Sequence, residues 1–239
     1  MTQGRIGAGT RAAVIGASGG IGGALATLLA ARGAEVLCFS RSGAAPQGMT
    51  AARLDVTDEA SIAAAAEGAG TLDLVIVATG ALHGATLAPE KDMRALNADR
   101  LIESFRVNAV GPALVAKHFL PLLRRHAPTV FACLSARVGS IGDNRVGGWH
   151  GYRASKAALN MLLKTLAIET ARKRPQAVIL ALQPGTVDTA LSKPFQGAVR
   201  PGHLFTPDQA AGHLLEVIDR ATPDWSGGLF DWRGERLPY

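Results

Sequence analysis

A tyrosine and a lysine stand four residues apart in the segment Tyr152-Arg153-Ala154-Ser155-Lys156. On a helix this spacing places both side chains on one face, one turn apart. A tyrosine normally titrates near ~10, too high for efficient proton transfer at neutral pH, and a neighbouring ammonium lowers that pKa by favouring the phenolate. The pair therefore predicts a general acid–base group, although the same spacing also occurs in ordinary pairs on a helix surface.

A glycine-rich segment, GASGGIG at residues 16–22, lies between a predicted strand and a predicted helix. Glycine permits a sharp turn and a close approach of the backbone to a pyrophosphate, and the start of the helix offers unpaired N–H groups to the phosphates. The same pattern also serves tight helix–strand packing. Its position after the first strand favours a nucleotide site, with expected contacts from Gly16, Ser18, Gly20, Ile21 and Gly22.

The second predicted strand ends in Ser40-Arg41-Ser42. An acidic residue at this point would accept hydrogen bonds from a ribose 2′-OH and repel a 2′-phosphate. Arg41 instead can bind a phosphate through parallel N–H groups, with the hydroxyls of Ser40 and Ser42 as further donors. We therefore expect NADP(H) to be preferred over NAD(H), the alternative being that Arg41 is a solvated loop residue.

Short apolar runs alternate with longer amphipathic stretches along the whole chain, which indicates βαβ units and a parallel sheet. Strands are predicted at residues 12–15, 35–39, 52–54, 72–78, 129–134, 177–182 and 229–232, the last at an edge, and helices at 21–31, 58–67, 98–123, 152–171 and 208–219. Pro112 and Pro121 predict a kink or a frayed end in the third helix. Two long loops, 135–151 and 184–207, follow strands at the edge where open α/β sheets bind ligands.

Together these patterns resemble the short-chain dehydrogenase/reductase family over essentially the whole chain. Further matches follow in the family's order: Asp55-Val56 after the third strand, Ala78-Thr79-Gly80 after the fourth, Asn108 within residues 107–111, and the segment from Pro184 to Thr189. The resemblance implies one doubly wound α/β domain of Rossmann type over residues 1–239. Its mostly parallel sheet would have seven strands in the order 3-2-1-4-5-6-7, with helices on both faces.

The resemblance also implies an activity, the transfer of a hydride between nicotinamide and a small carbonyl or alcohol. Tyr152 would exchange the proton of the substrate oxygen, Lys156 would lower the tyrosine pKa and position the ribose, and Asn108 would hold a water that relays protons. Thr189 and the backbone of Val187 would orient the nicotinamide. The remaining cofactor contacts implied are Asp55, Val56, Ala78, Thr79, Gly80, Pro184 and Gly185.

One position departs from the family pattern. The family has a serine that hydrogen-bonds the substrate oxygen at the second residue after the fifth strand, and this chain has Ala136 there. Ser135 stands one residue earlier, so on an extended strand its side chain points to the other face. We expect Ser135 to reach the site if the strand bulges, or Ser140 to do so from the loop. Losing one such donor typically costs about 10²–10³ in rate.

Within the family, residues 139–142, 147–149 and 231–235 resemble a subgroup that contains C-factor-like proteins and sniffer-type carbonyl reductases. That subgroup implies an NADPH-dependent carbonyl reductase. The competing hypothesis is a cofactor-binding regulatory or signalling protein with weak or no turnover. Ala136 and the C-factor resemblance favour it, and the presence of Asn108, Tyr152 and Lys156 opposes it. Residues 191–195 are a candidate lid, with Phe195 as its apolar contact, and Trp149 either walls the substrate pocket or anchors its loop.

Composition excludes several other classes of protein. The chain has 239 residues, 48% of them hydrophobic, which is enough for a sizeable core and excludes global disorder. Its two cysteines, Cys38 and Cys133, make no disulfide framework, and no zinc spacing occurs, so we expect buried thiols, no metal and a cytoplasmic location. Five glycines interrupt the uncharged run at residues 12–31, so we expect no membrane span.

The formal net charge of +6 invites a nucleic-acid hypothesis. The basic residues are scattered, and the clusters at 124–126 and 172–174 end predicted helices, where cations complement the helix dipole. Nucleic-acid binding is therefore only a minor alternative. The expected partners are a small carbonyl or alcohol substrate and further copies of the chain in a homodimer or homotetramer, as is common in the family.

Overall fold

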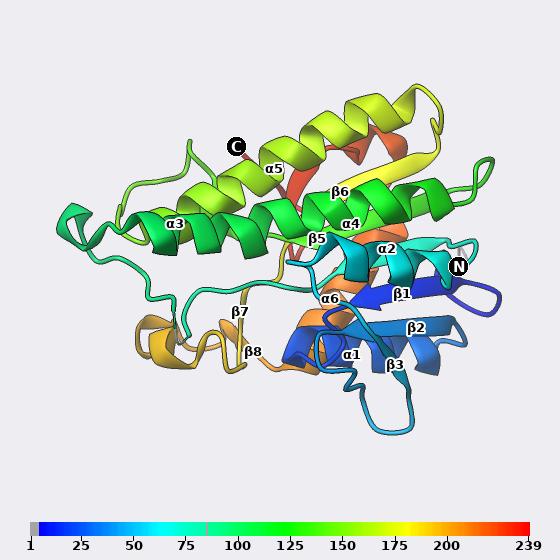
Figure 1. The fold of residues 1–239 in the computed structure, drawn as a ribbon, viewed down its shortest axis with the longest axis horizontal. Coiled ribbons are helices and arrows are strands. Elements are labelled where there is room, and N and C mark those ends of the chain that lie inside the picture. The colour runs from blue at the N-terminus through cyan, green and yellow to red at the C-terminus, as the bar shows by residue number, and fades with distance from the viewer. Residues whose placement is uncertain (1–4, 85) are drawn as a thin grey trace.

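A mostly parallel sheet forms the centre of the computed structural model, which describes residues 5–84 and 86–239 (Figure 1). Every neighbouring pair of strands is parallel except β10 and β9. The family order is therefore confirmed, and an eighth strand, β10, covers the edge expected at residues 229–232. Side by side, the strands are β10 (Arg236–Leu237), β9 (Gly228–Asp231), β6 (Ala177–Gln183), β5 (Thr129–Leu134), β4 (Leu74–Val77), β1 (Arg11–Ile15), β2 (Glu35–Ser40) and β3 (Ala51–Arg53).

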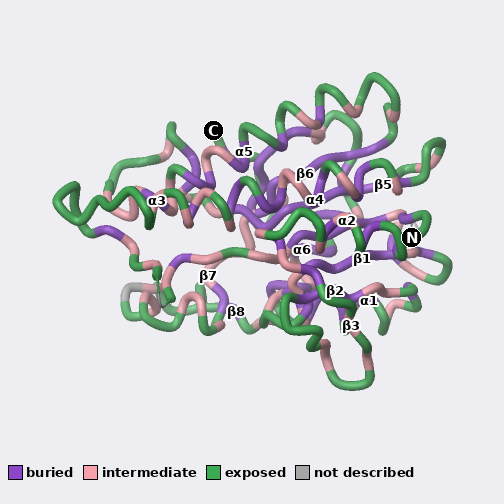
Figure 2. The backbone as a smooth tube through the Cα atoms, viewed as in Figure 1, coloured by how far each residue is buried: buried purple, intermediate pink, exposed green. Residues whose placement is uncertain are grey.

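Helices cover both faces of this sheet, as expected. Alternate residues of a strand point to opposite faces, and in β1 they enter two separate hydrophobic clusters. One cluster includes residues of α1 (Gly20–Ala31) and α6 (Pro207–Arg220); the other includes residues of α2 (Glu59–Glu67), α4 (Gly111–Phe119) and α5 (His150–Ala171). Buried backbone accordingly follows the central strands in Figure 2. The doubly wound α/β architecture is thereby confirmed.

The helix predicted over residues 98–123 is interrupted. It consists of α3 (Ala98–Phe105), a π-helical turn at Arg106–Val110, α4, and a 3-10 turn at Leu120–Leu122. Pro112 lacks the N–H that a regular helix would direct at the carbonyl of residue 108, and its ring crowds that carbonyl. The irregularity therefore precedes Pro112 and contains Asn108. Helical turns of this kind often occur at functional sites.

Other boundaries differ from the prediction by one or two residues. Asp58 caps α2 through its side chain rather than belonging to the helix, and α5 begins two residues before Tyr152. The fourth strand is shorter than the apolar run at 72–78, because Leu72 forms an isolated bridge with Leu123. The two long loops contain short elements: a 3-10 turn at Arg137–Gly139, another at Lys193–Ala198, and the small parallel pair β7 (Thr186–Val187) and β8 (Leu204–Phe205).

Candidate active site

The glycine-rich turn after β1 is shaped by contacts that exclude side chains. Gly16 has φ +94°, and a Cβ there would lie 3.0 Å from the carbonyl carbon of Ala78. A Cβ on Gly22 would overlap the carbonyl oxygen of Gly16, and one on Gly20 would lie 2.8 Å from Cγ2 of Thr189. The turn is therefore packed against both the end of β4 and the loop after β6. Ser18 and Gly20 are exposed, so the turn keeps an open surface.

A cavity of about 230 Å³ opens beside this turn. It is bounded by the glycine turn, the ends of β4 and β5, α5 and the loop after β6, so the structure brings together segments that are far apart in the sequence. The predicted site residues that line it are Gly20, Ile21, Gly22, Ala78, Thr79, Gly80, Ser135, Tyr152, Lys156, Pro184 and Thr189. Residues Asp55 and Val56 lie outside this lining, near the end of β3.

Two observations fit a nucleotide group at this cavity. The glycine turn leaves backbone rather than side chains at its surface, as close approach of a pyrophosphate requires. Thr79 is one of the residues that line the cavity, and its hydroxyl oxygen is buried with no hydrogen-bond partner among the described residues. Buried hydroxyls are normally paired, so Thr79 has a hydrogen-bonding capacity that a bound polar group would satisfy.

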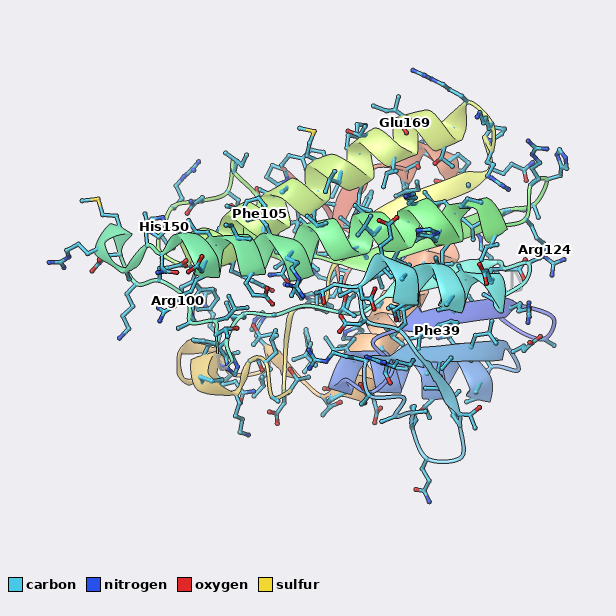
Figure 3. The ribbon with its side chains drawn as sticks, in the orientation of Figure 1. Phe39, Arg100, Phe105, Arg124, His150 and Glu169 are labelled. Carbon is cyan, nitrogen blue, oxygen red and sulfur yellow. The ribbon has the colours of Figure 1, made fainter. Side chains whose placement is uncertain are left out.

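Tyr152 and Lys156 lie one turn apart on α5 at the wall of the cavity, as the spacing predicted. Lys156 donates a hydrogen bond from Nζ to the carbonyl oxygen of Leu134 at 2.8 Å, and Nζ lies 5.8 Å from the centroid of the tyrosine ring. Burial lowers the pKa of Lys156 to about 8. Figure 3 marks the two ends of this helix by His150 and Glu169, and the pair lies at the His150 end.

The expected lowering of the tyrosine pKa is not found in this arrangement. Burial raises the pKa of Tyr152 to about 12. The physical reason is that the cavity wall removes the phenol from water, while the Lys156 ammonium is directed at Leu134. At neutral pH Tyr152 therefore holds its proton firmly.

Asn108 lies in the π-helical turn and is completely buried. Its Oδ1 accepts a hydrogen bond from the N–H of Ala81 at 2.9 Å, and its Nδ2 donates to the carbonyl oxygen of Ala81 at 2.8 Å. A Cβ at Gly80 would lie 3.5 Å from both Asn108 Oδ1 and Lys156 Nζ. Asn108 thus fixes the segment after β4 against the lysine. Its side-chain amide is engaged by protein groups, so a water relay through that amide would compete with these bonds.

The structure separates the two serines that were candidates for the substrate oxygen. Ser135 lines the cavity, but its hydroxyl donates to Oδ1 of Asn160 at 2.7 Å. Ser140 is buried, accepts the N–H of Asp143, and lines a different cavity on the far side of α5. Sequence reasoning missed Asn160, although its position, four residues after Lys156, continues the helix face that carries Tyr152 and Lys156.

The end of β2 differs in part from the prediction. The Ser40 hydroxyl is buried and donates to the carbonyl oxygen of Ala44 at 2.7 Å, so it shapes the loop instead of facing a phosphate. Arg41 and Ser42 are exposed. Burial alone would raise the pKa of Asp55, but hydrogen bonds from Thr57 and the charge of Arg41 hold that pKa below its usual value. Arg41 therefore lies close enough to β3 to influence the adjacent carboxylate.

The segment after β6 is partly turned away from the cavity. Gly185, with φ +81°, packs against the ring of Phe205, and Val187 is buried. The carbonyl oxygen of Val187 accepts a hydrogen bond from the hydroxyl of Ser192. Pro184 and Thr189 are thus the members of this segment that reach the cavity, since both line it.

Comparison with known proteins agrees with this architecture. The family model described as short chain dehydrogenase matches residues 10–199. The chain belongs to the short-chain dehydrogenase family. Members of this family are oxidoreductases, and that general class applies to this chain.

Two relatives have substantial sequence identity to the chain. It is 37% identical over 140 residues to the C-signal of Myxococcus xanthus, a match that covers 58% of this chain and 78% of that one. It is 33% identical over 219 residues to a 1-hydroxy-2-glutathionyl-2-methyl-3-butene dehydrogenase of Rhodococcus sp. (strain AD45), a match that covers 90% of this chain and 92% of that one.

Solved structures with lower identity share the short-chain dehydrogenase fold. NADPH-bound carbonyl reductase from chicken fatty liver superposes with a TM-score of 0.81 at 24% identity, covering 100% of this chain and 97% of that one. Carbonyl reductase Sniffer of D. melanogaster superposes with a TM-score of 0.79 at 19% identity, covering 97% and 100%. In the described part of the chain, no helix combines the length and apolar character that crossing a membrane requires.

Proposed function

We propose that the protein is an NADP(H)-dependent oxidoreductase that transfers a hydride between nicotinamide and a small carbonyl or alcohol substrate. The observation that carries the proposal is the position of Tyr152 and Lys156 on the wall of the cavity that the glycine turn borders. The cofactor, when bound, supplies or accepts the hydride. The turn at 16–22, Thr79 and Thr189 would hold it, and the exposed Arg41 and Ser42 favour a 2′-phosphate.

The tyrosine acts as the proton donor in the direction of carbonyl reduction. Because burial keeps the pKa of Tyr152 near 12, its Oη is protonated at neutral pH and can transfer that proton to the substrate oxygen as negative charge develops there. Lys156, with a pKa of about 8, carries its charge at pH 7, and it stabilises the phenolate that is left once its Nζ turns from the carbonyl oxygen of Leu134 towards Tyr152. Asn108 positions the segment that closes this corner of the cavity.

The second candidate is a cofactor-binding regulatory protein with weak or no turnover. Ala136 stands at the family's serine position, and the Ser135 hydroxyl is engaged by Asn160. The substrate oxygen therefore has fewer prepared donors than the family pattern provides. This candidate retains cofactor binding and differs from the first in turnover.

Turnover separates the two candidates. NADPH oxidation is followed by absorbance with a panel of aldehydes, ketones and quinones, for the natural protein, Tyr152→Phe and Tyr239→Phe. Tyr239 is the chain's other tyrosine and lies at the exposed carboxyl end, so it is the matched control. We expect Tyr152→Phe to reduce kcat by about 10²–10⁴-fold, with the dissociation constant of NADPH and the control unchanged. Tight NADPH binding without turnover of any substrate would favour the regulatory protein.

We further propose that the chain acts as one domain, as a homodimer or homotetramer, in the cytoplasm. Exposed apolar side chains on α3 and α5 support association, among them Ile102 and Met161 at 65% and 66% exposure. Both cysteines are free and buried, which suits a reducing compartment. Light scattering after size-exclusion chromatography tests the association, and a monomeric mass at micromolar concentration would contradict it.

A further inference from the structure

The backbone enters α5 through three successive left-handed residues. The φ angles are +68° at Gly147, +65° at Gly148 and +51° at Trp149. Within the described residues, Trp149 is the one non-glycine residue with positive φ. That conformation is disfavoured for a bulky L-residue, so glycine would suit position 149 better than tryptophan does. A local preference overridden in this way next to a catalytic residue points to a role for the side chain.

A buried glutamate holds this conformation in place. Glu90, from the loop after β4, is 4% exposed, and its Oε2 accepts a hydrogen bond from the N–H of Gly151 at 3.1 Å. Its main-chain oxygen accepts a second bond from the N–H of Trp149. A Cβ at Gly151 would lie only 3.0 Å from Glu90 Oε1, so the fit is close. Glu90 is therefore a positioning residue for the first turn of α5, and sequence reasoning did not find it.

The indole of Trp149 connects the catalytic tyrosine to the candidate lid. Its ring centroid lies 6.3 Å from that of Tyr152 and 4.9 Å from that of Phe195, both edge to face. Phe195 in turn lies 5.7 Å from the ring of His83. His83 Nε2 is within hydrogen-bond distance of the carbonyl oxygens of Ala190 and Leu191, at 3.1 Å each. A row of aromatic rings therefore extends from the proton donor to the lid.

We propose that Trp149 is the specificity-determining residue of the substrate side, and that the site prefers carbonyl compounds bearing an apolar ring to short aliphatic ones. This inference rests on the proposed reductase function. A ring placed against the indole gains edge-to-face or offset contact in addition to the area that it buries, whereas a short alkyl group leaves much of the aromatic row uncovered. Fixing the indole through Glu90 removes the entropy cost of ordering it when substrate binds.

The test compares two methyl ketones that differ in the ring, acetophenone and butanone. The values of kcat and KM with NADPH are measured for the natural protein, Trp149→Gly, Trp149→Phe and Trp225→Phe. Neither tryptophan is among the residues that line the cavity, but Trp149 contacts it through the ring of Tyr152. Trp225 stacks on Phe230 instead, so it is the control. Binding of each ketone to the NADP⁺-loaded proteins is measured by NMR, and the melting temperature and NADPH affinity are recorded for each variant.

We expect the natural protein to have a higher kcat/KM for acetophenone than for butanone. In Trp149→Gly the ratio of the two kcat/KM values should fall about 10-fold, chiefly through a higher KM for acetophenone. Its NADPH affinity should be unchanged and its melting temperature no lower, because glycine accepts the left-handed backbone. Trp149→Phe keeps a ring and should keep most of the preference, and it serves if the glycine variant folds poorly. An unchanged preference in Trp149→Gly, an equal loss in Trp225→Phe, or no preference in the natural protein would overturn the inference.

Failure of the reductase function is distinguishable from failure of this inference. If NADPH binds but neither these ketones nor any member of the panel of aldehydes, ketones and quinones is reduced, the proposed function fails, and the NMR measurement decides the role of Trp149. If acetophenone then binds more tightly than butanone to the natural protein, and this difference disappears in Trp149→Gly, the result supports the role of Trp149 in a protein without turnover. Equal binding of the two ketones would overturn it.

Discussion

Two sides of the cavity are built by different means: the glycine turn, which is the proposed cofactor side, and the surface beside Tyr152, which is the proposed substrate side. At the glycine turn, Gly16 and Gly22 bring backbone against backbone, with a Cβ at Gly16 only 3.0 Å from the carbonyl carbon of Ala78, and Gly20 leaves room for the Thr189 side chain. Beside Tyr152, which lines the cavity, the rings of Trp149 and Phe195 form a row behind it, and the backbone of Trp149 has a positive φ. The first surface depends on the absence of side chains, and the second depends on their presence.

This difference separates a general requirement, room for a pyrophosphate, from a particular one, the choice of substrate. A pyrophosphate needs N–H groups and space, which a short local pattern of glycines provides. Discrimination among carbonyl compounds needs shaped side-chain surfaces, which long loops provide. Ligand binding on the proposed cofactor side should therefore be most sensitive to substitutions that add atoms, such as Gly→Ala. On the proposed substrate side it should be most sensitive to substitutions that remove them.

The largest expected effect breaks the cofactor side. Gly22→Ala forces a methyl group into the carbonyl oxygen of Gly16, so the turn must move. We expect NADPH binding to be lost and the free energy of unfolding to fall by about 1–3 kcal/mol. Gly212→Ala, in α6 with no heavy atom within 4 Å of the added Cβ, should leave NADPH binding unchanged and raise the free energy of unfolding by about 0.5–1 kcal/mol, because alanine favours a helix interior. Calorimetric titration measures NADPH affinity, and urea unfolding measures the free energy of unfolding. Undiminished NADPH binding by Gly22→Ala would show that the close contact between Gly22 and Gly16 is not needed to bind the cofactor.

Arg41→Ala sharpens the comparison at the outer end of the cofactor side. Its guanidinium is exposed, and its expected partner is the 2′-phosphate. Removing a charge-assisted contact should weaken NADPH binding about 10–100-fold and leave NADH binding unchanged. Arg125→Ala, an exposed arginine outside the cavity lining, is the control. An unchanged ratio of the two dissociation constants would show that Arg41 is a solvated loop residue.

Lys156 lines the cavity between the glycine turn and the surface beside Tyr152. Because burial lowers the pKa of Lys156, we expect the free energy of unfolding to depend on pH. Its folded pKa of about 8 lies below the unfolded value near ~10.4, so the unfolded chain binds more protons between these values. The free energy of unfolding should therefore rise from pH 8 towards pH 10, relative to Lys156→Met. The raised pKa of Tyr152 acts in the opposite direction, but only above about pH 10.

Urea unfolding at several pH values measures this effect. Lys164→Met, an exposed lysine on the same helix, should run parallel to the natural protein across the range. Parallel curves for Lys156→Met as well would show that Lys156 is not desolvated in solution.

The smallest expected effect concerns Ser135 on the substrate side. Its hydroxyl hydrogen is held by Asn160 at 2.7 Å, so it contributes little to the substrate oxygen unless the hydroxyl rotates. We expect Ser135→Ala to lower kcat less than about 10-fold, compared with the 10²–10³-fold typical of a prepared donor. Ser140→Ala, in a different cavity, should leave kcat unchanged. A loss of about 100-fold in Ser135→Ala would restore Ser135 to the role of the family's serine.

Much of the fold was predictable because its signals are local. Apolar runs buried on both faces predicted the central strands, and the strand–glycine–helix pattern predicted the first turn. The prolines correctly predicted that the helix at 98–123 is interrupted, near Pro112 and at Pro121, but they did not predict the π-helical turn that contains Asn108. The strand β10 was missed because Arg236–Leu237 is too short to show a period of its own.

Local sequence patterns predicted the strands and the residues offered to the cavity, including Tyr152, Lys156 and the glycines, because spacing of four on a helix and glycine after a strand act within one element. The order of the sheet came from the family resemblance. The tertiary structure alone decided which polar groups are free. It engaged Ser40 with Ala44 and Ser135 with Asn160, buried Glu90 beneath α5, and raised the pKa of Tyr152 to about 12. Hydrogen-bond partners and burial depend on which distant segments meet, and no local pattern specifies that.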